Sequence, residues 1–241
     1  MLTYITVDIS NNMYRGGIEI SATKNKDSLG NATAIKISRK AKNKPGWFDV
    51  YTQQLETVDD LSFNLFDITT ICGITYSYSF DVMAGNGIIE SGTIEDIQCW
   101  FEGLFVGDFI KQYVAGSNYT TDVKRNREVA YVTTLGSRTP YRVSNGLANY
   151  STGSSSGLFL RLTDDKKGFV PDVDHSFCDE VVEFLSDGNS KVLKTHDGQV
   201  WYISIDGAID IPFNERFGGM NSVSFNWTEI GDIPAFGMVV D

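Results

Sequence analysis

Residues 183 to 207 read EFLSDGNSKVLKTHDGQVWYISIDG, and this stretch carries the clearest fold signal in the chain. An apolar segment ends at Asp187 and Gly188, a pair that indicates a helix stop. Two strand-like segments follow and flank the dipeptide Asp197-Gly198. Because a type I′ turn needs two residues at positive φ, this dipeptide predicts a β-hairpin with a two-residue loop.

The two-residue loop fixes the register of the hairpin, so that Leu193 pairs with Tyr202. Successive side chains of a strand point to opposite faces. Trp201, Ile203 and Ile205 are therefore expected to share one face of their strand.

The apolar segment before the hairpin predicts the one helix of the chain, over residues 177–185. Asp174 and Ser176 are its candidate N-caps. Elsewhere Val, Ile, Thr, Tyr, Phe and Trp are abundant, and 23 glycines stand beside only 5 prolines. That mixture favours many short strands joined by turns. The sequence therefore predicts an all-β protein with one helix.

The 241 residues allow one large β domain or two ordinary ones. Alternating strand-like segments recur from Thr3 to Ile97, and the pattern changes after Gln98. We therefore predict a β-sandwich over residues 1–98 and a second β domain over residues 99–241.

The first domain contains a strand that ends in Arg, then a Trp-containing strand, then the run GITYSY at residues 73–78. In this order, residues 32–97 resemble a fibronectin type III-like module. There, a tyrosine that follows a turn glycine locks the corner between the two sheets. An unrelated antiparallel sandwich explains the pattern equally well.

The formal net charge of −11 argues against nucleic-acid binding, which needs clustered Lys and Arg. The single basic run, residues 39–44, is interpreted as a solvated hairpin loop. No window has the length of a transmembrane helix, and the N-terminus has no signal-peptide pattern. We expect neither membrane insertion nor specific nucleic-acid binding, and we expect synthesis in a cytoplasm.

No residue set predicts a cofactor, a metal site or a catalytic centre. His175 and Cys178 have the i, i+3 spacing of two ligands on one helical face, but a zinc site needs a second pair. We interpret them as a helix-start histidine and a buried cysteine. The acidic clusters lack the ligand spacing of an EF-hand loop, and nucleophile and phosphate-loop motifs are absent. The sequence therefore predicts no enzyme.

Four stretches of the second half resemble tail-hub and distal tail proteins of tailed bacteriophages. They are EGLFVGD at 102–108, TLGSRTPYRVSNGLANYSTGSSSGLFL at 134–160, the helix and hairpin quoted above, and FNWTEIGD at 225–232. The resemblance implies a split β-barrel with a long protruding loop or hairpin and a helix lying across the barrel. It also implies barrels that pack side by side in a ring around the tail channel. Distal tail proteins commonly begin with the ring-forming domain, whereas here the sandwich comes first, so the broader expectation is a tail or baseplate structural protein.

The resemblance thus predicts a non-enzymatic structural subunit of a phage tail tip or baseplate, which links the tail tube to distal components. Its expected partners are copies of itself in a ring, with a hexamer as the expected size, and other tail or baseplate proteins. It would be made in the bacterial host cytoplasm and located in the virion. The alternative is a carbohydrate- or host-receptor-binding β-sandwich module of a virion, because exposed Trp and Tyr side chains suit stacking on sugars.

Residues 151–157 form the segment of lowest complexity and are expected to be an exposed flexible loop or arm. Such a segment cannot bury a core, so it would become ordered against a neighbouring subunit. Deleting Thr152 to Ser156 should then leave the monomer folded but weaken the ring. The candidate assembly residues are Asn149, Tyr150, Ser151, Thr152, Gly153, Ser154, Ser155, Ser156 and Gly157.

Carboxylates that face a DNA channel would repel the phosphates of the duplex, although ordinary solubility also explains an acidic chain. The acidic residues of the second domain are expected nearer the ring axis than the basic loop 40–44. The candidate lumen-facing residues are Asp164, Asp165, Asp172 and Asp174.

Overall fold

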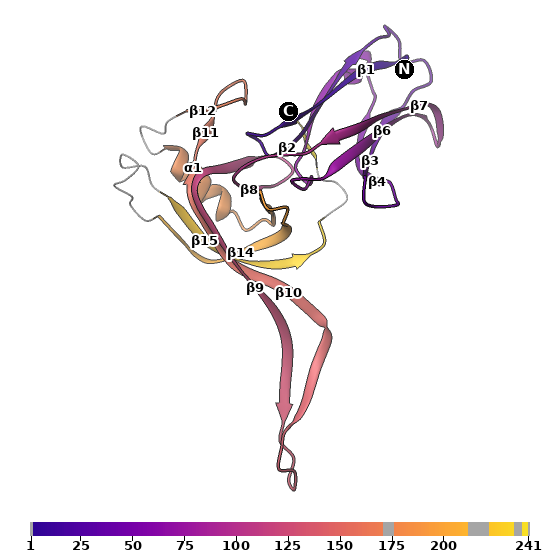
Figure 1. Ribbon diagram of the computed structural model, residues 1–241. Helices are drawn as coiled ribbons and strands as arrows, with labels where there is room; N and C mark the ends of the chain where they lie inside the picture. Colours follow the sequence, from indigo (N-terminus) through magenta and orange to yellow (C-terminus); the bar gives the residue numbers. More distant parts are fainter. Residues whose placement is uncertain (1, 171–175, 212–221, 234–237, 241) are drawn as a thin grey trace.

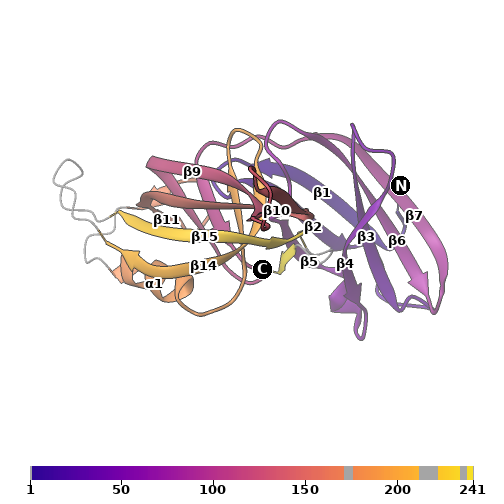
Figure 2. The same ribbon diagram turned by 90° about the horizontal axis from the view of Figure 1, so that it is seen from below.

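The computed structural model describes residues 2–170, 176–211, 222–233 and 238–240. Strands make up most of the described chain, and they form a sandwich and a closed barrel that lie side by side (Figures 1 and 2). A long two-stranded arm projects from the barrel (Figure 1). The predicted all-β class with a barrel and a helix is confirmed.

The sandwich has two four-stranded antiparallel sheets. The first contains, in spatial order, β1 (Ile5–Asn12), β2 (Gly17–Lys24), β5 (Phe63–Asp67) and β16 (Met238–Val240). The second contains β4 (Phe48–Gln54), β3 (Ala34–Ala41), β6 (Thr75–Ala84) and β7 (Gly87–Gln98), and a short 3₁₀ helix spans Val58–Leu61. Because β16 pairs with β5, a strand near the end of the chain completes the N-terminal sheet. The domain boundary at residue 98 stays a prediction.

The alternation of β6 builds the sandwich core, because Tyr76, Tyr78 and Phe80 point inward in turn. The corner tyrosine expected at this strand is present: the Ile71 backbone N–H donates to the Tyr76 hydroxyl at 2.9 Å. Beside it, Asp67 is fully buried and accepts from the Tyr78 hydroxyl at 2.8 Å. This bond ties the end of one sheet to the centre of the other.

The barrel closes through six strands. In spatial order they are β10 (Tyr141–Phe159), β15 (Val223–Gly231), β14 (Val200–Asp210), β13 (Lys191–Thr195), β8 (Leu104–Gly107) and β9 (Gln112–Val132). A small hairpin of β11 (Arg161–Leu162) and β12 (Phe169–Val170) precedes the helix α1 (Ser176–Leu185).

Helix α1 matches the predicted helix and covers the barrel core. Its apolar residues recur at helical spacing, and Phe177, Val181 and Phe184 are buried among barrel side chains. The helix stops where Ser186 N–H bonds the Val182 carbonyl and Gly188 adopts a φ of 77°, since a glycine accepts the left-handed conformation at little cost. Of its two candidate caps, Asp174 lies outside the described residues.

The predicted hairpin exists, but its expected register was wrong by one residue. Leu193 pairs with Trp201 instead of Tyr202. The loop has three residues, because the Thr195 N–H donates to the Gln199 carbonyl at 3.0 Å and Gly198 takes a φ of 85°. Both Thr195 and Gln199 also donate side-chain hydrogen bonds to Asp197, which favours the longer loop. Trp201, Ile203 and Ile205 still face the barrel core together.

Strand β13 joins the barrel to the sandwich, because both of its faces are buried. Leu193 points into the barrel core. Val192 packs against Phe66 and Ile68 of the sandwich. A Cβ on Gly107 would stand 2.5 Å from the Ile68 Cδ1 atom, so the two domains approach as closely as a glycine allows.

Lys194 lies at the centre of this joint with no exposed surface. Its ammonium group donates to the Ile68 carbonyl at 2.6 Å and stands 5.1 Å from the ring centroid of Phe101. Burial lowers the pKa of Lys194 to about 8. A buried amine bonded to backbone carbonyls of the other domain fixes the two domains to each other.

Candidate assembly surfaces

The arm is the part of β9 and β10 that extends beyond the barrel, residues 125–151. Thr152 is the first residue of β10 that pairs with β15, so the arm strands pair only with each other. Eight residues of β9 lie in the arm, which corresponds to a length on the order of 25 Å. Figure 1 shows the arm pointing away from both the barrel and the sandwich.

The two faces of the arm differ in chemistry. Residues paired across a ribbon share a face, so Arg142 lies on the same face as its partner Tyr131. Alternate residues of one strand also share a face, so Arg125 and Arg127 of β9 lie there too. We call this the cationic face. The opposite face carries exposed apolar side chains, namely Val132, Tyr141 and Val143. At the tip, Leu135 is 107% exposed.

The charge of the arm is opposite to that of the remainder. The arm contains four arginines and one glutamate, a net charge of +3. The rest of the chain has 16 lysines and arginines against 30 aspartates and glutamates, a net charge of −14. A basic, solvent-exposed ribbon on an acidic protein is suited to contact an acidic surface.

The predicted assembly segment, residues 149–157, is not a flexible loop. It lies in β10, where Thr152 to Gly157 pair with β15 on one side and most of them with β9 on the other. Only Asn149, Tyr150 and Ser151 belong to the arm, at its root. The expectation of a flexible loop was wrong. Because Thr152 to Ser156 pair with strands on both sides, we now expect their deletion to disturb the barrel wall.

The Ser and Gly residues of this segment are small because Trp227 packs beside them. Ser155 is buried and accepts a hydrogen bond from the indole N–H of Trp227 at 3.0 Å. A Cβ on Gly153 would stand 2.3 Å from the Asp122 carbonyl oxygen and 2.6 Å from the indole ring. The low complexity therefore reflects close packing and not disorder.

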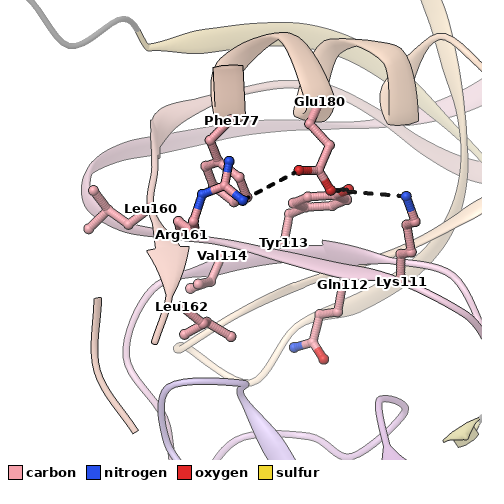
Figure 3. A pocket seen from close by; sticks show the side chains of 9 residues that line it. All are labelled: Lys111, Gln112, Tyr113, Val114, Leu160, Arg161, Leu162, Phe177 and Glu180. Atoms are coloured by element: carbon pink, nitrogen blue, oxygen red, sulfur yellow. Dashed lines mark hydrogen bonds and ion pairs between the residues drawn. The ribbon is translucent and has the colours of Figure 1, made fainter. Parts of the chain in front are cut away.

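A groove runs between helix α1 and the start of β9; we call it the α1 groove. It consists of two adjoining cavities of about 240 and 330 Å³, which share Lys111 and Glu180. Figure 3 shows Glu180 pointing from the helix toward Lys111 and Arg161, at 4.0 and 3.9 Å. The Tyr113 hydroxyl donates to the same carboxylate at 2.7 Å. Burial, together with this carboxylate, raises the pKa of Tyr113.

The outer part of the α1 groove is acidic and carries one exposed apolar side chain. Its lining includes Asp108, Glu183 and Asp187. The buried Lys191 ammonium bonds Asp187 at 2.7 Å and Asp108 at 3.3 Å. Glu183 has no ion-pair partner among the described residues. Ile110, at the edge of the groove, is 78% exposed.

Gln112 also lines the inner cavity, but strand alternation turns it away from the helix, as Figure 3 shows. Its amide nitrogen and oxygen are buried without a hydrogen-bond partner among the described residues. The sequence contained no signal for the α1 groove or for the buried Gln112 amide, because both depend on how β9 packs.

The candidate lumen residues divide into two groups. Asp164 and Asp165 lie in the turn between β11 and β12, next to Lys166 and Lys167. Asp165 accepts hydrogen bonds from the Thr163 hydroxyl and the Lys167 N–H, which lower the pKa of its carboxyl. This is turn chemistry. Asp172 and Asp174 lie outside the described residues.

A separate cavity, of about 450 Å³, opens on the sandwich beside the basic run 39–44. Trp47 and Phe48 at its rim are 47% and 44% exposed, and Tyr76 forms part of its wall. Arg39 also lines it and is fixed by Asp67 at 2.5 Å. Although burial opposes the charge of Arg39, the charge of Asp67 raises its pKa. The basic run is therefore part of a pocket with aromatic walls.

The described residues contain no cluster of His, Cys, Asp and Glu suited to hold a metal ion. Cys178 is buried, as expected, and the three cysteines form no disulfide with one another. His175 lies outside the described residues, and the ring of His196 bonds the Tyr119 hydroxyl at 2.9 Å. Among the helices of the described chain, none is long and apolar enough to cross a membrane.

No protein-family model and no curated protein matches the sequence. Among solved structures, a chain from the virion of a native gene transfer agent particle is similar, with 18% identity and a TM-score of 0.33. The match covers 58% of this chain and 95% of that chain. A chain from the tail of an empty gene transfer agent particle, with C6 symmetry, gives the same identity and TM-score over 55% of this chain and 93% of that chain. At these TM-scores the similarity carries no argument about this chain.

Proposed function

We propose that the chain is a non-enzymatic structural subunit of a phage tail tip or baseplate, which assembles into a ring around the tail channel. The observation that carries this proposal is the arm. Its residues 125–144 contribute no buried side chain to a core, yet they expose tyrosine, valine and leucine to solvent. An exposed apolar patch on a basic ribbon is the character of a protein contact surface.

The rest of the molecule supports the same proposal. A closed barrel leaves no open sheet edge, and the buried Lys194 contact fixes the barrel to the sandwich. A rigid body with one projecting arm can repeat the same contact from subunit to subunit, and such contacts close into a ring when the rotation permits. The order of sequence motifs resembles that of tail-hub and distal tail proteins, whose barrels form such rings.

Within this proposal we expect a hexamer that links the tail tube to distal components, made in the host cytoplasm and located in the virion. Of the candidate assembly residues, Asn149 and Tyr150 stay proposed for the assembly surface because they are accessible at the root of the arm, whereas Ser151 beside them is buried. Asp164 and Asp165 remain proposed as lumen-facing. An assembled ring with a neutral or basic lumen lined by other residues would contradict that placement.

Sedimentation velocity and negative-stain microscopy of the purified chain test the proposal. We expect rings and a species six times the 26.7 kDa mass of the chain. A chain that stays monomeric at every concentration, alone and with tail-tube protein, contradicts it.

A second candidate function is carbohydrate binding by the sandwich, which the aromatic pocket favours. Pockets of a few hundred Å³ with aromatic walls and a few polar groups are typical ligand sites. Binding of host cell-wall glycans, measured by isothermal titration calorimetry, should then be lost in Trp47→Ala. The matched control is Trp100→Ala, which removes a similarly exposed tryptophan outside the pocket. Equal binding by both variants would rule this function out.

A further inference from the structure

The proposed assembly needs a surface that receives the arm. We propose that the cationic face of the arm docks in the α1 groove of a second copy of this chain. This inference rests on the proposed function and adds the contact by which one subunit recognises the next.

The cationic face is free to make such a contact. Arg125, Arg127 and Arg142 are exposed and have no ion-pair partner among the described residues. The Nε atom of Arg125 donates a hydrogen bond to the Asn149 side chain at 3.0 Å. Tyr131 stands on the same face with 68% of its surface exposed. Arginine and tyrosine are enriched at the centres of protein interfaces.

The α1 groove offers the complementary surface. Glu183 lines it, and Asp179 stands one helical turn earlier on the same side of the helix. Neither carboxylate has an ion-pair partner among the described residues. The exposed Ile110 at the groove edge supplies an apolar contact for Tyr131. The groove is thus a hollow in which Lys111 and Arg161 are already paired with Glu180, whereas the carboxylate of Glu183 is unpaired and that of Asp179 lies beyond its edge.

The net charge of the second domain outside the arm also favours contact between the arm and another copy of the chain. Outside the arm, residues 99–241 contain eight lysines and arginines against 18 aspartates and glutamates. A basic ribbon is therefore attracted to the barrel of another copy before any specific contact forms.

The contact cannot close within one chain, because the arm points away from α1 (Figure 1). Each subunit would instead offer an arm to one neighbour and a groove to the other. Such a head-to-tail contact builds a closed ring or a continuing stack.

Charge reversal on each surface tests the proposal. Arg125→Glu with Arg127→Glu reverses the arm, and Asp179→Lys with Glu183→Lys reverses the groove. Either variant should raise the concentration at which half of the chains assemble by about tenfold or more, because close like charges replace opposite charges. All four positions are exposed, so circular dichroism and the unfolding midpoint should change little. The matched controls are Lys44→Glu and Glu95→Lys, exposed charges on the sandwich that should have no effect.

Mixing the two variants gives the decisive result. In a one-to-one mixture, the reversed arm of one variant meets the reversed groove of the other, and the remaining contacts are those of the wild type. Assembly should return to within about threefold of the wild-type concentration, and it should also return in the chain that carries all four substitutions.

The possible failures are distinguishable. A wild-type chain that never assembles overturns the proposed function and this inference together. Wild-type rings that form equally well with a reversed arm, or mixtures that show no rescue, overturn only the inference. If the reversed arm leaves assembly intact but abolishes retention of duplex DNA, the cationic face serves nucleic acid, and the inference is wrong.

Discussion

The joint between the two domains and the arm show opposite uses of polar and apolar side chains. At the joint, a lysine is fully buried with its ammonium on backbone carbonyls, and large aromatic side chains pack around it. On the arm, tyrosine, valine and leucine are exposed, and the arginines face solvent. The joint therefore stabilises one chain, whereas the arm adds little to that stability and is available to a neighbour. Each prediction below tests this contrast.

The largest expected effect is at the joint. Phe105 is fully buried, and its ring stands 4.9 Å from that of Phe101. Phe105→Ala should lower the free energy of unfolding by about 3–5 kcal/mol, because it leaves a cavity between the domains. Urea denaturation followed by tryptophan fluorescence measures this loss. A loss of less than about 1 kcal/mol would mean that the joint is not a packed core.

The part of β10 that lies in the barrel, next to the arm, should behave as a packed core. Ser155→Ala leaves the buried indole N–H of Trp227 without its acceptor, which should cost about 2 kcal/mol. The control is Ser154→Ala on the same strand, which removes a less buried hydroxyl and should change stability by less than about 0.5 kcal/mol. Equal effects of the two substitutions in urea denaturation would contradict the packing role of Ser155.

The buried amine predicts a pH dependence of smaller size. The pKa of Lys194 is about 8 when folded and 10.5 when unfolded, so between these values the unfolded chain binds more protons. Stability from this group therefore rises with pH, by about 1.4 kcal/mol from pH 7 to pH 9. Burial also raises the pKa of the neighbouring Cys99 thiol. Above pH 9 the unfolded chain loses this proton more readily than the folded chain, so stability from Cys99 falls with pH, and the measurement therefore ends at pH 9.

Urea denaturation at pH 7, 8 and 9 measures this slope, and Lys194→Met is the control. The methionine keeps the apolar bulk without a titrating group, so the rise should disappear. A slope that survives the substitution would assign it to another residue.

The sequence predicted the sandwich and the helix because their apolar residues recur with a single period. The sequence did not predict the length of the hairpin loop, because that length depends on side-chain contacts. Asp197 receives hydrogen bonds from both Thr195 and Gln199, and these favour a three-residue loop over the two-residue loop that Asp-Gly suggests. The spacing of apolar residues along the two strands is compatible with both loop lengths.

The candidate site was predicted only in part, for a related reason. A protruding hairpin was implied by the resemblance, and the structure has one. The segment chosen for assembly was wrong in structure because serine and glycine are typical of loops, yet here they fit beneath Trp227. The burial of Lys194 could not be foreseen, since its carbonyl partner at Ile68 lies 126 residues away.

The central claim is that the arm serves assembly and not folding. Replacing residues 130–143 with Asn-Gly should keep the ribbon closed, because Val129 and Ser144 are paired and a two-residue turn can join them. The free energy of unfolding and the oligomeric state of this variant, measured by urea denaturation and sedimentation velocity, test the claim directly. We expect a change in stability of less than about 1 kcal/mol, together with loss of the assembled species. A shortened chain that still assembles, or one destabilised by more than about 2 kcal/mol, would contradict the claim.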